Sequence, residues 1–342
     1  MYIPVLKNRQ FENKFIREQQ EYFDERITPL IEVLNLKIGR TPMKVEDMLS
    51  TYDSYFSSDY LVDFFTFVDR EYTKFDPSQV PFYFEHRNDT IKEYQQLLTT
   101  VCQSKFGVPV ISIKKGRDFL LNSLSIKALI ENLQFQTPKI AVRIQSGLLQ
   151  NFFKDIDIIL REEDILIYDI NEDSIQSKFF DRKLLATKSK QYKSIVLHSP
   201  RSSKINNGSY LDGIYTGLID NSIKTEYKNL GFDGFADYAG LKNVLPTTGS
   251  NGKGAALGLF YDSSKNQFFS IMNSDTDQGT SGHIYVLTQA FEEHKQKLNP
   301  NDDCPAFEYM DQNLYSRGKP GQWGQWKYIT LLRYVSQVKS SL

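Results

Sequence analysis

Cysteine and histidine are scarce in this chain of 342 residues. The two cysteines, Cys102 and Cys304, lie far apart and fit no metal-ligand spacing, which argues against a disulfide framework and against a cysteine zinc site. The four histidines form no His-x-x-x-His or His-x-His pair, so a histidine metal site has no local support. This cysteine usage is typical of a protein from a reducing cytoplasm.

The net charge is also close to zero, and long apolar runs are absent from the sequence. The formal net charge of -1 gives no general attraction to nucleic acid or to an acidic membrane surface. No run approaches the roughly 18 apolar residues of a membrane span, and the N-terminus lacks the basic stretch and apolar core of a signal peptide. We therefore expect a cytoplasmic protein with no membrane partner.

Short apolar runs, each with one polar side chain in it or at its end, recur along the first 240 residues. They cover residues 2 to 7, 28 to 33, 60 to 65, 108 to 114, 140 to 144, 165 to 170, 194 to 198 and 232 to 238. Runs rich in β-branched and aromatic residues indicate buried strands, and amphipathic helical segments between them favour parallel pairing. The pattern predicts an α/β fold, a closed (β/α)8 barrel over residues 1 to 240.

The third strand has a competitor in the sequence. Residues 82 to 86 also read as a strand, and their inclusion would turn residues 60 to 65 into a helix. We favour residues 60 to 65 because Asp63 then takes the position that Glu32 and Asp169 hold in their runs. Residues 241 to 342 are predicted to be an extension packed on the barrel, with a β-hairpin formed by residues 255 to 261 and 267 to 272 and a C-terminal helix.

Ionisable side chains follow the predicted strands at their C-terminal ends, where barrels of this kind place their active sites. They are Lys7, Glu32, Asp63, Arg143, Asp169, His198 and Asp237. Alternation along each strand puts Arg143 with Ala141 and Asp169 with Ile167, and ionised groups facing the helix layer would be costly to bury. We therefore expect all of them to point into the barrel or to its mouth.

These residue types suggest two kinds of chemistry. As acid/base groups, Asp169, His198, Asp237 and Glu32 are the candidate catalytic residues, while Arg143, Lys7 and Asp63 would bind the substrate. The carboxylates Glu32, Asp63, Asp169 and Asp237 would also suit Mg²⁺ or Mn²⁺, which prefer oxygen ligands. Two plainer interpretations stand beside these: a structural ion network, or charged residues that merely begin solvated loops.

A glycine-rich segment from Gly249 to Gly254 invites comparison with a phosphate-binding loop. The match fails, because Thr247 stands where the first glycine is needed and Lys253 is followed by Gly254. A weaker phosphate role remains open, since loops after the last strands of such barrels often bind phosphate.

The opening Met-Tyr-Ile-Pro-Val-Leu-Lys, followed by Ile-Thr-Pro-Leu-Ile-Glu-Val, resembles the so-called beta protein family of phages and bacteria. The segments Val-Pro-Val at 108 to 110, Val-Arg-Ile at 142 to 144 and Gly-Phe-Asp-Gly-Phe-Ala-Asp-Tyr at 231 to 238 are similar to that family in order and spacing, as is the Trp-containing C-terminal helix. The resemblance implies the barrel fold and a setting among phage-defence genes. It brings no catalytic residues to carry over.

Two functions follow as hypotheses. The first is a hydrolase or lyase, metal-assisted or acid/base, that acts on a phosphorylated or nucleotide-like ligand. The second is a module that binds a small anionic ligand or a partner protein without turnover, through the barrel mouth or through Trp323 and Trp326.

Overall fold

The computed structural model describes residues 1–38, 41–64, 67, 75–115, 120–189, 191–245 and 253–342, and these form two compact units. The first contains residues 1–199 and 225–237, and the second contains residues 200–224 and 238–342. Residues 200–224 lie between two barrel strands in the sequence but belong to the second unit, which the predicted boundary at residue 240 does not show. None of the described helices is long and apolar enough to cross a membrane.

The first unit is a closed barrel of parallel strands, which confirms the predicted fold class. Its strands, in chain order, are β1 (Tyr2–Lys7), β2 (Leu30–Val33), β5 (Tyr60–Phe64), β6 (Gly107–Ile113), β7 (Ala141–Gln145), β8 (Ile165–Asn171), β9 (Lys193–His198) and β11 (Gly234–Asp237). They lie side by side in this same order, and β11 closes the ring against β1. The strand at residues 60 to 64 is thus the third of the barrel, as predicted, whereas residues 82 to 86 belong to a helix.

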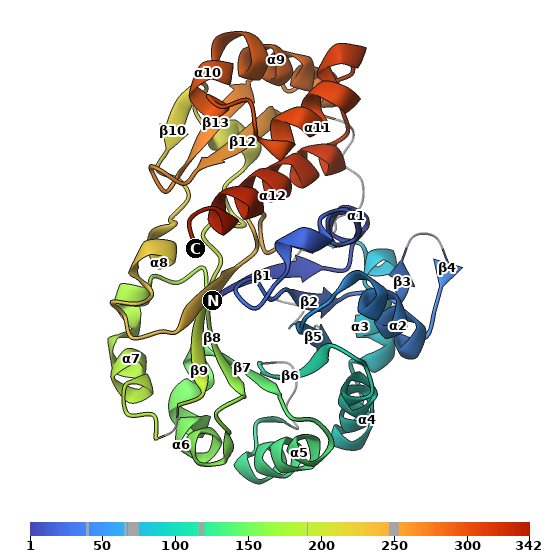
Figure 1. Cartoon of the computed structure of the whole chain (residues 1–342), viewed down its shortest axis with the longest axis vertical. Helices are drawn as coiled ribbons and strands as arrows, with labels where there is room; N and C mark the ends of the chain where they lie inside the picture. The colour runs from blue at the N-terminus through green and yellow to red at the C-terminus, as the bar shows by residue number, and fades with distance from the viewer. Residues whose placement is uncertain (39–40, 65–66, 68–74, 116–119, 190, 246–252) are drawn as a thin grey trace. The chain divides into compact units, whose positions relative to one another are not determined.

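Helices α2, α4, α5, α6 and α7 lie outside the ring of strands (Figure 1). The helices of this unit are α1 (Gln10–Glu18), α2 (Val45–Tyr55), α3 (Pro81–His86), α4 (Ile91–Cys102), α5 (Ser123–Gln136), α6 (Leu149–Ile159) and α7 (Phe179–Leu185). At the start of α4, Thr90 and Glu93 form a capping box: the Thr90 N–H donates to Glu93 Oε2 at 2.7 Å. A short β3–β4 pair (Lys37–Ile38 and Thr41–Pro42) follows β2.

The second unit is built on an antiparallel sheet in the order β10–β13–β12. The predicted hairpin is β12 (Ala256–Asp262) with β13 (Gln267–Asn273), and β10 (Ile214–Thr216) adds the third strand. The helices here are α9 (His283–Thr288), α10 (Lys295–Leu298), α11 (Pro305–Asn313) and α12 (Trp323–Lys339), while α8 (Ser222–Glu226) lies where the chain returns to the barrel unit. Apolar side chains of α12, among them Leu331 and Val335, are buried.

Candidate functional site

Charged side chains meet at the C-terminal end of the barrel interior. We call this set the mouth cluster and define it as Lys7, Glu32, Asp63, Lys114, Arg143 and Asp169, all of them buried. The strand register explains the convergence, because Lys7 is level with Glu32 and Glu32 with Asp63. Below these charges the same inward row is apolar, with Val5, Leu30 and Leu61 on these three strands.

Arg143 is the centre of the mouth cluster. Its Nη1 donates to Glu32 Oε1 at 2.7 Å and to Asp63 Oδ2 at 2.9 Å, and its Nε donates to Asp169 Oδ2 at 2.9 Å. In the ring, β7 is next to β6 and β8, whereas Glu32 lies three strands away on β2. The guanidinium therefore reaches Glu32 through the barrel interior, which fixes the inward direction of this row.

Lys7 and Glu32 form a second buried ion pair, with 2.7 Å between Nζ and Oε2. Burial lowers the pKa of the Lys7 ammonium to about 8, against the opposing effect of Glu32. Burial alone would raise the pKa of Glu32, but Lys7 and Arg143 outweigh it and lower that pKa to about 2. Glu32 therefore stays ionised at neutral pH, which suits a group that positions cations and rules it out as a proton donor.

Lys114 is the member of the mouth cluster that the sequence analysis missed. It follows β6 directly and shares the inward row with Ser112, which is level with Arg143. Burial lowers the pKa of Lys114 and Arg143 lowers it further, while Asp169, Glu32 and Asp63 oppose them. The alternation of Val108, Val110, Ser112 and Lys114 was the available signal.

Two polar atoms beside this lysine are buried without a hydrogen-bond partner in the described part of the chain. One is Asp63 Oδ1, whose companion Oδ2 is held by Arg143, and the other is Ser112 Oγ. The two residues lie on the neighbouring strands β5 and β6. Buried polar groups are nearly always satisfied, so each exception needs an explanation, such as a ligand or water that completes the site.

His198 and Asp237 do not lie in the mouth cluster, and the expectation that they face it is wrong. Register connects Tyr168 with Val196, Val196 with Phe235, and Phe235 with Tyr2, so these four share one row. That row faces the helices, because the Tyr168 hydroxyl donates to Asp181 Oδ2 in α7 at 2.5 Å. His198 and Asp237, two residues beyond Val196 and Phe235, continue this outward row.

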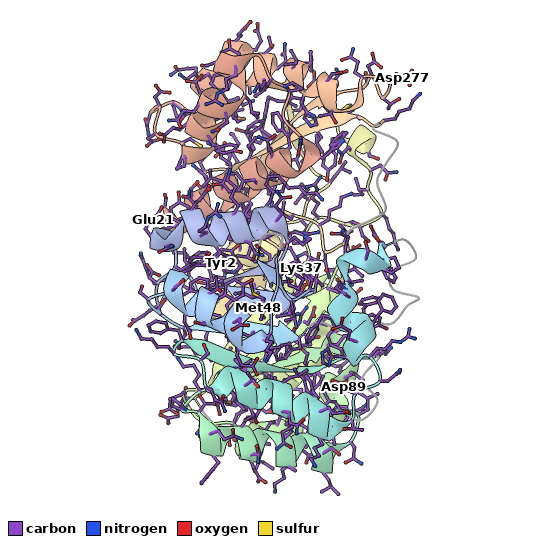
Figure 2. The ribbon with its side chains drawn as sticks, turned by 90° about the vertical axis from the view of Figure 1, so that its right-hand side faces the viewer. Tyr2, Glu21, Lys37, Met48, Asp89 and Asp277 are labelled. Atoms are coloured by element: carbon purple, nitrogen blue, oxygen red, sulfur yellow. The ribbon has the colours of Figure 1, made fainter. Side chains whose placement is uncertain are left out.

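Asp237 has a partner in the same row. The Tyr2 hydroxyl donates to Asp237 Oδ1 at 2.8 Å, and the Tyr2 ring stacks on Phe235 with 4.8 Å between ring centroids. Tyr2 lies among the packed side chains of the unit and has no exposed surface (Figure 2). These contacts give Asp237 a structural setting outside the barrel interior.

The carboxylates of the mouth cluster do not fit a divalent metal ion as they are placed. The centre between Glu32, Asp63 and Asp169 holds the Arg143 guanidinium, and Lys7 occupies the other oxygen of Glu32. Asp237, the fourth proposed ligand, lies in the outward row. Across the described residues, no group of three or more His, Cys, Asp or Glu is placed to hold a metal ion. We therefore derive no step through Mg²⁺ or Mn²⁺.

Two other predicted features belong to the second unit. Trp326 is buried and its Nε1 donates to the Pro320 carbonyl at 2.9 Å, so it is a core residue and no surface anchor for a partner. Most of the glycine-rich segment, residues 246–252, lies outside the described residues. Its described Lys253 forms an exposed ion pair with Asp277 at 2.9 Å.

Comparisons with known proteins add little to this site. No family model matches the chain, and no curated protein matches it. Among solved structures, a DUF72 family protein from Enterococcus faecalis is similar at 10% sequence identity and a TM-score of 0.34, over 73% of this chain and 92% of that one. The resemblance to the beta protein family therefore stays a prediction.

Proposed function

We propose that the mouth cluster is the centre of an acid/base enzyme, a hydrolase or lyase that acts on a small ligand with one anionic group. The observation that carries the proposal is the unsatisfied Asp63 Oδ1, which is buried, like the unsatisfied Ser112 Oγ on the neighbouring strand, at the C-terminal end of the barrel, where such folds place their active sites. A carboxylate with one oxygen fixed by Arg143 and the other open is oriented to accept a proton.

Each remaining member of the cluster has a supporting role in this proposal. Lys114, with its pKa lowered by burial, exchanges a proton near neutral pH more readily than an exposed lysine does. Glu32 and Asp169 hold the Arg143 guanidinium in place. The Asp169 carboxylate is itself fixed by the Asn171 N–H, which donates to its Oδ1 at 2.9 Å.

The charges of the cluster limit the ligand. Lys7, Lys114 and Arg143 carry positive charge and Glu32, Asp63 and Asp169 carry negative charge, so the set is balanced. Balanced charges offer little attraction to a polyanion such as a nucleoside triphosphate. A single phosphate or carboxylate group, placed against Lys114 and Ser112, agrees better with this arrangement.

A non-catalytic binding module is the second candidate. The observation in its favour is that Arg143 directs its hydrogen bonds to three carboxylates of the protein itself. Such a network can hold a barrel together without any turnover. A setting in phage defence, which the resemblance to the beta protein family implies, is proposed on that resemblance alone.

Proton transfer provides a test that needs no prior substrate. The protein is incubated in D₂O with a panel of phosphorylated and carboxylate small molecules, and NMR follows deuterium incorporation and product formation. We expect turnover or exchange that falls about 100-fold or more in Asp63→Asn and in Lys114→Met, as loss of an acid/base group requires. Lys115→Met, which removes the exposed neighbouring lysine, is the matched control and should retain the activity.

Turnover that survives both Asp63→Asn and Lys114→Met would contradict the acid/base proposal. Saturable binding of a panel member with no exchange or product would support the binding module instead. Circular dichroism of each variant verifies that the comparison is made between folded proteins.

A further inference from the structure

A cavity of about 390 Å³ opens at the N-terminal end of the barrel, opposite to the mouth cluster. From it we infer a second binding site, for a free α-amino acid with an apolar side chain. Cavities of this size hold small molecules, and those that do combine an apolar lining with a few placed polar groups. This site is independent of the proposed enzyme activity.

The inward rows of the barrel strands build the cavity. Asp59, Lys139 and Glu163 each stand two residues before an inward-facing strand residue, so they continue the inward row beyond the strand starts. Above them the cavity ends on Leu61 and Val108, which are level with each other on neighbouring strands. The barrel interior is thus apolar in its middle and charged at both ends.

Charges of both signs line the rim. Lys139 pairs with Asp59, which leaves Lys193, Glu25 and Glu163 without an ion pair among the residues that the structure describes. Lys193 is level with Ile165 on the adjacent strand, and both residues line the cavity. A zwitterion satisfies both signs at once, whereas an amine or a carboxylate alone leaves one of them unmatched.

Ser58, which precedes β5, adds a hydrogen-bonding group on the side of the cavity opposite to Lys193 on β9. Its Oγ is buried, lines the cavity and has no hydrogen-bond partner in the described part of the chain. The ligand carboxylate would accept a hydrogen bond from Lys193 on β9, and its ammonium would donate to Glu163, which precedes the neighbouring strand β8. The apolar side chain would lie against Leu61, Val108 and Ile165, where burial of apolar surface is favourable.

Calorimetric titration of the full chain with L-leucine and with L-phenylalanine tests this inference. We expect saturable binding that weakens at least about tenfold in Lys193→Met and in Glu163→Gln, because each loses a charge-assisted hydrogen bond. Glu162→Gln is the matched control, since Glu162 is the exposed neighbour of Glu163 and does not line the cavity. Its affinity should equal that of the parent chain.

Isopentylamine and 4-methylpentanoate, which each keep one charge and the apolar body, should bind at least about tenfold more weakly than leucine. The inference is overturned if neither amino acid gives saturable binding at millimolar concentration, or if the rim variants bind as well as the parent chain. Equal affinity for the one-charge analogues would overturn the zwitterion assignment. Asp63→Asn, at the opposite end of the barrel, should leave leucine binding unchanged, which separates this site from the mouth cluster.

Discussion

Arg143 on β7 and Glu32 on β2 are joined by an ion pair of 2.7 Å that passes through the interior of the barrel. The two strands are separated by β6 and β5 in the ring, so backbone pairing does not bring these residues together. Both side chains are buried, and a charge removed from water is tolerated only when it is paired. The ion pair therefore fixes the orientation of both side chains, and the loss of either one leaves the other charge buried without this partner.

Replacement of Arg143 by methionine should destabilise the barrel strongly. The substitution leaves Glu32, Asp63 and Asp169 without their shared cation, and breaking a buried pair in this way costs about 3 to 5 kcal/mol. Urea unfolding of the parent chain and of each variant measures the change in the free energy of unfolding. Arg26→Met is the control, because Arg26 pairs with Asp24 at the surface, and its loss should cost less than about 1 kcal/mol. Equal stabilities of the two variants would contradict the role of Arg143 as the centre of the cluster.

Asp169→Asn and His198→Ala should differ once an activity is in hand. Asp169 holds Arg143 with two contacts, so its neutralisation should lower both the activity and the free energy of unfolding, the latter by roughly 3 to 5 kcal/mol. His198 lies in the outward row, so His198→Ala should leave kcat unchanged. Steady-state kinetics measure the activity of both variants, and thermal unfolding compares their stability. A loss of activity in His198→Ala at unchanged stability would restore His198 to the site.

Acid should lower the free energy of unfolding, because Glu32 becomes protonated. Its pKa is lowered from 4.5 to about 2 in the folded chain, so the folded state binds fewer protons than the unfolded state between these values. The resulting stabilisation is present above pH 4.5 and is lost as the pH falls to 2, by roughly 3 kcal/mol. Urea unfolding across this window should give a flatter pH dependence for Glu32→Gln. A curve as steep as that of the parent chain would contradict the lowered pKa.

The Lys7 ammonium should titrate at about pH 8. NMR of ¹⁵N-labelled lysine side chains, with Lys7→Met to assign the resonance, measures it directly. Glu32→Gln should lower the pKa of Lys7 still further, because Glu32 opposes the effects of burial and of Arg9 and Arg143. A pKa that rises on this substitution would be inconsistent with the ion pair.

The strands and five members of the mouth cluster were predictable because each run carries its own alternation. Within a run, alternation places Arg143 with Ala141 and Asp169 with Ile167, and both assignments are confirmed. It does not say which row of a strand faces inward when polar residues occur near the ends of both rows.

The inward row depends on pairing between strands, which a single sequence does not show. At the end of β8 the register is also irregular: Asp169 pairs with Leu197, yet Asn171 pairs with His198. Asn171 has a φ of 51°, in the left-handed region, and this backbone bend accommodates the extra residue. Alternation within β9 puts His198 with Val196, so the side of His198 follows only once strand pairing shows which row faces the helices. Lys114 was left out of the candidate set although it ends the predicted run at residues 108 to 114 and alternates with Ser112.

A crystal structure determined from crystals soaked in Mn²⁺, with anomalous diffraction data, shows whether Arg143 or a metal ion holds the three carboxylates of the mouth cluster. The Arg143 guanidinium should lie between Glu32, Asp63 and Asp169, within hydrogen-bond distance of all three carboxylates, with no anomalous peak there. A manganese peak coordinated by these carboxylates, with Arg143 turned away from them, would contradict this arrangement.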